Sequence, residues 1–338
     1  MTTLILRRLG VALATVFGAS MFSFLVLRKL PGDPARLVGG ELADETTIAN
    51  LRAAMGLNKP LPAQYWDYLT HLVRGDLGFS YSMGQPVATL VRTRLPASIE
   101  LGITAVLIAV IWATSYAAFA VYRRRRGVDT SLRVTSSIAM GSPSFWLALV
   151  LILVLSVKLG IFPGPEGRLS PSLSPPPTRT GLYTLDALLA GQFSTFFNAL
   201  WHLILPGFTI AVGPFAFISR LFRSQLRNSV REPFALVARS RGLTRRKVFL
   251  RHVVPNSLLP LVAVTSMLVA ELMTGSVLVE KVFAWPGVGS LTVDAILQKD
   301  FSVVQGVILL SAVLYVTASF LADIAYVVID PRVRVGAH

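Results

Sequence analysis

The sequence of 338 residues contains no cysteine and has few charged residues for its length. Without cysteine, neither a disulfide bond nor a thiolate metal site can form. Asp, Glu, Lys and Arg together make up 14% of the chain, against about 25% in a soluble domain, and 53% of the residues are hydrophobic. This composition excludes an ordinary soluble domain and indicates a protein that spans a lipid bilayer.

The chain also lacks the short motifs on which several enzyme classes depend. It has no G-x-x-x-x-G-K-[ST] phosphate loop, so nothing in it argues that it binds ATP itself. It has no H-E-x-x-H zinc motif, and its four histidines are scattered. A membrane hydrolase or glycosyltransferase needs a polar constellation within its spans, and Glu271 with Asp323 is too small a set. We therefore expect no catalytic residue, no bound cofactor and no metal in this chain.

Long segments without Asp, Glu, Lys or Arg recur along the sequence. Each is long enough, or nearly so, to cross about 30 Å of hydrocarbon as a helix rising about 1.5 Å per residue. They predict an all-α integral membrane protein with six transmembrane helices. The first segment follows Arg7 and Arg8, and because no A-x-A-like cleavage site follows it we interpret it as a retained helix. The six segments are residues 9–27, 101–122, 134–157, 199–219, 253–270 and 301–322.

The net charge of +15 is divided unevenly between the two sets of loops that this topology creates. With the N-terminus in the cytoplasm, the inner segments hold 19 of the 32 Lys and Arg residues and three of the 17 acids. Because Lys and Arg concentrate in cytoplasmic loops, the pattern predicts a multi-pass protein of the plasma (inner) membrane with both termini cytoplasmic. The four arginines at 123–126 are interpreted as contacts to membrane lipid, with anionic headgroups, rather than to nucleic acid.

Turn and capping residues predict how the outer segments are organised. Asp44 is expected to cap a helix that ends at Met55-Gly56, and a second amphipathic helix is expected from Pro62 to Val73. These helices belong to an insert that is small for an independent domain, so we expect it to sit on the membrane core. The Pro- and Ser-rich segment 161–177 is expected to be extended. The expected divisions are an N-terminal transmembrane helix at 1–29, the extracytoplasmic insert at 30–96, a transmembrane core with helices 2–6 at 97–329 containing a cytoplasmic loop at 220–252, and a cytoplasmic tail at 330–338.

The segment 220–251 is the most basic part of the chain, with ten Lys or Arg residues and one acid, Glu232. Glu232-Pro233 is expected to open a short helix over residues 234–241, and Gly242 is expected to end it as a C-cap glycine. Thr244 can cap a second helix that runs on into the membrane. A helix–Gly–helix elbow of this kind is a surface suited to another protein. The alternative is an amphipathic element on the membrane surface, with its basic residues on lipid headgroups.

Few polar residues lie within the predicted spans. We expect Glu271, with Ser266, Thr274 and Gly275, to face a substrate path or a partner subunit, because a buried carboxyl group is costly unless it is hydrated, paired or protonated. The alternative is an interhelical hydrogen bond that only positions helices. Asp323 is interpreted as a structural cap or ion-pair partner. Three prolines are expected to break or kink the third and fourth spans: Pro143, Pro206 and Pro214.

A series of short motifs runs through the chain: PGDP at 31–34, MGLNKPLPAQYWDYL at 55–69, GDLGFS at 75–80, SPSFWLAL at 142–149, KLGIFP at 158–163, GSVLVEKVFAWPGVGSL at 275–291, VVQGVILL at 303–310 and DIAYVVIDPR at 323–332. In this order and spacing they resemble the peptide-transport (oligopeptide and dipeptide) permease family of ATP-binding-cassette importers. The resemblance covers nearly the whole chain, and it is to the permease subunit with the long first outer loop. It implies a type I importer permease fold.

The basic loop is similar to the EAA motif of this family, in which E-A-A is followed after three residues by Gly and later by a Pro. Ala238, Gly242 and Pro255 fall on that spacing, whereas Leu236 and Val237 stand where the family has Glu and its first Ala, and His252 replaces an Ile. The resemblance implies that the loop forms a coupling helix seated on an ATPase subunit. The residues expected to couple to the ATPase are Phe234, Ala238, Arg239, Gly242, Leu243 and Pro255.

The resemblance also implies the other subunits of the transport complex. A second homologous permease would enclose the path with this chain, two ATPase subunits would supply ATP and Mg, and an extracytoplasmic peptide-binding (lipo)protein would deliver short peptides. The residues Trp285, Pro286, Gly287 and Gly289 would form an outer gate or contact the binding protein, and Trp285 suits the membrane interface. Related importers of nickel chelates or glutathione, a proton-coupled secondary transporter that uses Glu271, and a membrane enzyme stay open as alternatives.

Overall fold

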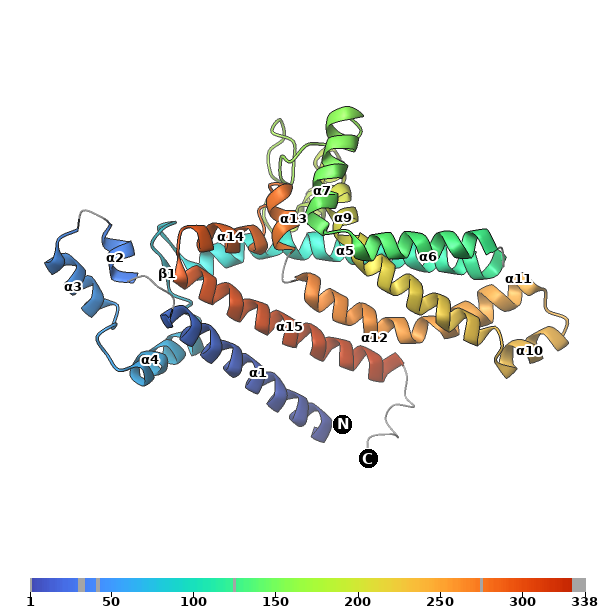
Figure 1. The fold of residues 1–338 in the computed structure, drawn as a ribbon, viewed down its shortest axis with the longest axis horizontal. Helices are drawn as coiled ribbons and strands as arrows, with labels where there is room; N and C mark the ends of the chain where they lie inside the picture. Colours follow the sequence, from blue (N-terminus) through green and yellow to red (C-terminus); the bar gives the residue numbers. More distant parts are fainter. Residues whose placement is uncertain (1, 30–33, 41–42, 124–125, 274–275, 330–338) are drawn as a thin grey trace.

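The computed structural model describes residues 2–29, 34–40, 43–123, 126–273 and 276–329, and this part of the chain is almost entirely helical. Figure 1 shows an elongated body in which the long helices run roughly along its length. The helices α2 to α4 lie at one end and the α10–α11 elbow lies at the other. One short antiparallel pair, β1 (Phe79–Ser80) and β2 (Gln85–Pro86), breaks the helical pattern within the described ranges.

Four helices in the described residues are long and apolar enough to cross a membrane. Helix α12 (Val254–Met273) covers the fifth expected segment and has 20 residues. All six expected apolar segments are mainly helical. By length and composition, the described residues give four membrane-spanning helices, or five when one bent pair of helices is counted as a span. The four long helices are α1 (Thr2–Lys29), α5 (Val87–Arg123), α9 (Phe193–Ser229) and α15 (Phe301–Ile329).

The third expected span is not one straight helix. Helix α6 (Arg126–Gly141) and helix α7 (Ser144–Leu151), which continues into the π-helical segment η1 (Ile152–Lys158), meet at an angle of 105°. Pro143 lies at the bend and adopts extended backbone angles. A proline has no N–H to donate and disfavours a helical conformation of the residue before it, so the first helix ends here. The expectation of a break at Pro143 is confirmed.

Proline does not interrupt the fourth span. Pro206 and Pro214 both lie inside α9, which stays continuous over 37 residues. The expected break is therefore not present at these two positions, and the kink expected as the alternative stays a prediction. A proline within a helix removes one backbone hydrogen bond, and in a membrane helix packing against neighbours can offset that loss.

The α5–α9 contact forms the centre of the molecule. A stripe of buried alanines on α5, Ala105, Ala109, Ala113 and Ala117, recurs every four residues and so lies on one face of the helix. Small side chains let two helix backbones approach closely, which is how membrane helices gain packing energy. On α9, a Cβ added at Gly207 would lie 3.1 Å from Thr104 Cγ2, which confirms how closely the helices approach.

The outer insert packs on the first span, as expected. Asp44 caps α3, and its carboxylate accepts a hydrogen bond from Thr47 N at 3.3 Å. Tyr65 of α4 contacts Phe24 of α1 with ring centroids 5.3 Å apart, and its hydroxyl lies 3.0 Å from Ser20 Oγ. The shorter helices are α2 (Pro34–Gly39), α3 (Glu45–Ala54), α4 (Leu61–Val73), α8 (Tyr183–Leu189), α10 (Pro233–Ser240), α11 (Arg245–Val248), α13 (Val277–Val282) and α14 (Val288–Leu297), with π-helical η2 (Phe249–Val253) between α11 and α12.

The alanine stripe predicts a size limit at the α5–α9 contact. Ala113→Leu should lower the free energy of unfolding by about 1–3 kcal/mol, because extra atoms in a closely packed core force strain. Thermal unfolding of the purified protein measures the effect. Ile111→Leu is the control, since Ile111 lies on the exposed face of the same helix turn. Equal melting temperatures for the two variants would contradict the importance of this contact.

Candidate functional site

The basic elbow has the geometry that its sequence predicts. Glu232 is the extended N-cap residue of α10 and Pro233 is its first helical residue. Gly242 has φ of +79°, the left-handed region that favours glycine. Thr244 then caps α11, and its Oγ1 accepts a hydrogen bond from Lys247 N at 3.4 Å. The sequence therefore fixes a short helix, a sharp reversal and the start of a second helix.

Helix α10 has an inner face and an outer face. Ala235 and Ala238 are buried in the main hydrophobic cluster, whereas Phe234, Leu236 and Val237 are exposed. About half of Leu236 and of Val237 is accessible to solvent, at 55% and 49%. An apolar patch left exposed in this way usually marks an interaction site. Among the predicted coupling residues, Phe234 thus lies on the outer face, while Ala238 supports the helix from inside.

The elbow is fastened to the ends of the long helices. Arg245 donates a hydrogen bond to the carbonyl oxygen of Tyr122 at the end of α5, at 2.5 Å. Ser257 of α12 donates a hydrogen bond to Ser229 Oγ at the end of α9, at 2.9 Å.

The remaining predicted coupling residues lie in different surroundings. Leu243 packs against the main hydrophobic cluster, and Pro255 is exposed in the first turn of α12. Arg239 is exposed at the elbow surface.

The second arm of the elbow continues into a membrane helix without a break. Helix α11 passes directly into η2, and η2 passes directly into α12. A force on the elbow is therefore transmitted to α12 through helical backbone rather than through a loose loop. The sequence predicted this connection from Thr244, but gave no sign of the π-helical turn.

The predicted path residues cannot be placed in the same way. Ser266 and Glu271 belong to α12, but their side chains lie outside the described part of the structure. Thr274 and Gly275 lie outside the described residues altogether. Their role stays a prediction.

The segment after α13, which is expected to form an outer gate or a binding-protein contact, is largely buried. Trp285 is 1% exposed, and its Nε1 donates a hydrogen bond to the carbonyl oxygen of Ala97 in α5, at 2.9 Å. The indole therefore packs within the protein rather than against lipid, and it finds its hydrogen-bond partner there. Pro286 is half-buried, and Gly287 and Gly289 are buried.

The two glycines of this segment surround a buried carboxylate that the sequence analysis missed. Glu280 of α13 is fully buried, and its carboxylate accepts hydrogen bonds from Ser98 Oγ at 2.7 Å and from Ser290 N at 2.9 Å. A Cβ at Gly287 would lie 2.4 Å from both Glu280 Oε2 and Ser98 Oγ, and one at Gly289 would lie 2.8 Å from Glu280 Oε2. Glycine is required here because the backbone closes on the carboxylate.

The electrostatics of Glu280 follow from its burial. Helix α13 lies outside the candidate spans. Burial raises the pKa of Glu280, and the hydrogen bonds from Ser98 and from the Ser290 N–H offset part of that rise. The signal that could have indicated this residue is its acidic side chain directly after the apolar VLV, shortly before the glycine-containing WPGVG.

The irregular loop between η1 and α8 is anchored rather than free. Arg168 forms a buried ion pair with Glu100 of α5, with its Nη2 2.6 Å from Glu100 Oε2. The Arg168 guanidinium also lies 3.5 Å from the centroid of the Tyr183 ring. The segment 161–177 contains no helix or strand, as expected, but the sequence gave no indication of this pairing. Removing either partner would leave a buried charge uncompensated.

These features define a polytopic helical membrane protein with a basic elbow at one end and a buried, hydrogen-bonded carboxylate on α13. Residues 105–335 match the family described as "Binding-protein-dependent transport system inner membrane component". Residues 1–102 match the family of the N-terminal part of such membrane components. The chain belongs to this binding-protein-dependent transport family, which confirms the resemblance stated from the motifs.

Relatives of known description cover nearly the whole chain. The probable D,D-dipeptide transport system permease protein DdpB of Escherichia coli K12 is 37% identical over 321 residues, which is 95% of this chain and 94% of the relative. The di/tripeptide transport system permease protein DppB of Pseudomonas aeruginosa is 36% identical over 99% of both chains. The oligopeptide transport system permease protein AppB of Bacillus subtilis is 31% identical over 99% of this chain and 100% of its own length.

The close approach of the backbone to Glu280 predicts that adding one methyl group at Gly287 destabilises the protein. Gly287→Ala should lower the free energy of unfolding by about 1–3 kcal/mol, because its Cβ cannot be accommodated beside Glu280 and Ser98. Gly213→Ala is the matched control, since a Cβ there meets open space. Melting temperatures of the two purified variants test the difference. A Gly287→Ala variant as stable as Gly213→Ala would show that the segment does not close on the carboxylate.

Proposed function

We propose that this chain is a permease subunit of an ATP-driven importer of short peptides. The curated relatives are described as transport permeases for dipeptides, tripeptides and oligopeptides, and the chain has no phosphate loop of its own. The proposed complex contains a second homologous permease and two ATPase subunits, which bind ATP and Mg. An extracytoplasmic peptide-binding (lipo)protein delivers the solute.

The observation that carries the proposal is the outer face of α10. Three apolar side chains, Phe234, Leu236 and Val237, are presented to solvent on a helix whose inner face is fixed by alanines. Fully burying such a side chain contributes about 1.5–3 kcal/mol. The neighbouring Arg231, Arg239 and Arg241 are exposed, so we propose that the partner surface is a groove with an apolar floor and an acidic rim. We propose that this groove belongs to an ATPase subunit.

Motion of the ATPases would reach the membrane through α12. The elbow joins α10 to the continuous series α11, η2 and α12, and Gly242 holds the reversal. A tilt of α10 therefore tilts α12, which carries Ser266 and Glu271. We propose that α12 and the following Thr274 and Gly275 line the path or face the second permease.

The orientation follows from charge. The segments 220–251 and 123–133 carry 15 of the 19 Lys and Arg residues of the inner segments, and positive charge marks the cytoplasmic side. Figure 1 shows the start of α1 and the end of α15 toward the same end of the body as the elbow. We therefore propose that both termini are cytoplasmic, in the plasma (inner) membrane. The segment with Pro286, Gly287 and Gly289 then lies toward the extracytoplasmic side, where we propose that it forms part of an outer gate.

The α10 face predicts a selective loss of coupling. In the complete complex reconstituted in vesicles, Leu236→Glu should reduce ATP-driven uptake of a labelled dipeptide at least tenfold, because an ionised carboxylate cannot enter an apolar groove without a large desolvation cost. Uptake and ATPase activity are measured together. Leu189→Glu is the control, since Leu189 is equally exposed on α8, far from the elbow in sequence.

Two results would contradict the proposed function. Undiminished ATP-driven uptake by Leu236→Glu would remove α10 from the ATPase contact. Uptake that continues without ATPase subunits and collapses with the proton gradient would indicate a secondary transporter instead.

The backbone at Gly242 predicts a second effect. Gly242→Val should impair assembly with the ATPases or uptake while leaving membrane insertion intact, because a β-branched residue with positive φ costs about 1–2 kcal/mol or more. No atom lies within 4 Å of an added Cβ, so the effect is conformational rather than steric. Gly242→Asn is the matched control, since Asn tolerates this region better. Co-purification of the ATPase subunits measures assembly, and equal yields for Val and Asn would refute the requirement.

A further inference from the structure

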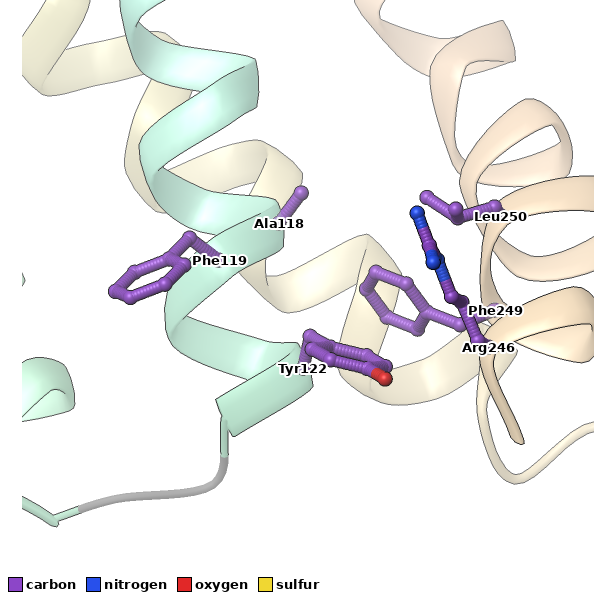
Figure 2. A pocket seen from close by; sticks show the side chains of 6 residues that line it. All are labelled: Ala118, Phe119, Tyr122, Arg246, Phe249 and Leu250. Atoms are coloured by element: carbon purple, nitrogen blue, oxygen red, sulfur yellow. The ribbon is translucent and has the colours of Figure 1, made fainter.

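A small apolar cavity lies between the end of α5 and the second arm of the elbow. Its volume is about 160 Å³, and it is lined by Ala118, Phe119 and Tyr122 from α5 and by Arg246, Phe249 and Leu250 from α11 and η2. Figure 2 shows the two sets of side chains on facing elements, with Arg246 running alongside Phe249 and Leu250. Phe119 and Leu250 are 48% and 52% exposed, so the cavity opens to the surroundings of the helices.

Two arginines lie against aromatic side chains of this cavity, and a third arginine lines it. The Arg123 guanidinium is 5.6 Å from the centroid of the Phe119 ring, and the Arg245 guanidinium is 5.2 Å from the centroid of the Tyr122 ring. Arg246 itself lines the cavity. The cavity is thus an apolar slot with a rim of positive charge, located where a membrane-spanning helix ends.

The size and charge of the slot select one kind of occupant. An apolar cavity of about 150 Å³ is enough to bind benzene, so this slot can take several carbons of an acyl chain. A helix of another subunit, about 10–12 Å across, is too wide to enter it. Basic pockets between helices at the cytoplasmic surface suit anionic lipid headgroups. Charge complementarity therefore favours an anionic lipid over a zwitterionic one.

We propose that this slot is a binding site for an anionic phospholipid. One acyl chain enters between Phe119 and Leu250, and the phosphate group pairs with the arginine rim, with Arg246 as the contact within the slot. The lipid would bridge the end of α5 to the elbow, because its two walls belong to these two elements. This site is separate from the outer face of α10, so it does not depend on which partner binds there.

Lipid retention by the purified complete complex tests the proposal. Native mass spectrometry is carried out with phosphatidylglycerol and with phosphatidylcholine of the same acyl chains. The wild-type protein should retain phosphatidylglycerol more tightly. Arg246→Gln should weaken phosphatidylglycerol binding about fivefold, as expected for one basic residue near a membrane surface, and leave phosphatidylcholine unchanged. Ala118→Leu should weaken both lipids, because its side chain fills the slot.

Controls and contrary outcomes are well defined. Arg251→Gln removes an exposed arginine from the same helical arm that does not line the slot, and should retain wild-type lipid preference. Equal retention of the two lipids by the wild type, or equal effects of Arg246→Gln and Arg251→Gln, would overturn the proposal. Because the chain has no cysteine, Leu250→Cys gives a single thiol within it. Efficient cross-linking of that thiol to a partner subunit would show that protein covers the slot and would also overturn it.

Discussion

The close contact between α5 and α9 sets the positions of the other elements. It depends on alanines at every fourth residue of α5, among them Ala109 and Ala113, and on Gly207 in α9. Within a membrane, helices gain little from leaving lipid, so close packing of small residues must supply the association energy. Helix α5 then holds other parts of the chain at two places. Its first half holds the outer segments through Ser98 and Glu100, and its last turn holds the elbow through Tyr122.

Different kinds of interaction hold the outer segments and the elbow against α5. For the outer segments, buried charge and hydrogen bonds fix the loops, as the Glu100–Arg168 pair and the carboxylate of Glu280 show. Such networks are rigid because each group loses its partner if the loop moves. At the elbow, the contacts are apolar packing beneath α10 and single arginine contacts at the rim. The outer segments are thus anchored, while the elbow leaves an exposed face for a partner.

Much of the elbow could be predicted from sequence because its signals are local. Pro233, Gly242 and Thr244 act through their own backbone preferences, and the structure confirms the helix, the reversal and the second cap. The insert helix capped by Asp44 was predictable for the same reason. The outcome was different for Pro206 and Pro214, which do not interrupt α9, since whether a proline breaks a membrane helix depends on the packing around it.

By itself, the sequence determined the membrane class, the helical segments, the basic side and the family, because hydropathy, charge and motif order are properties of consecutive residues. Only the tertiary structure decided that Trp285 is internal, that Gly287 closes on Glu280, and that Glu100 meets Arg168. These pairs join residues that are far apart along the chain or on either side of a turn. Their contact depends on how α5 packs, and no local pattern encodes that geometry.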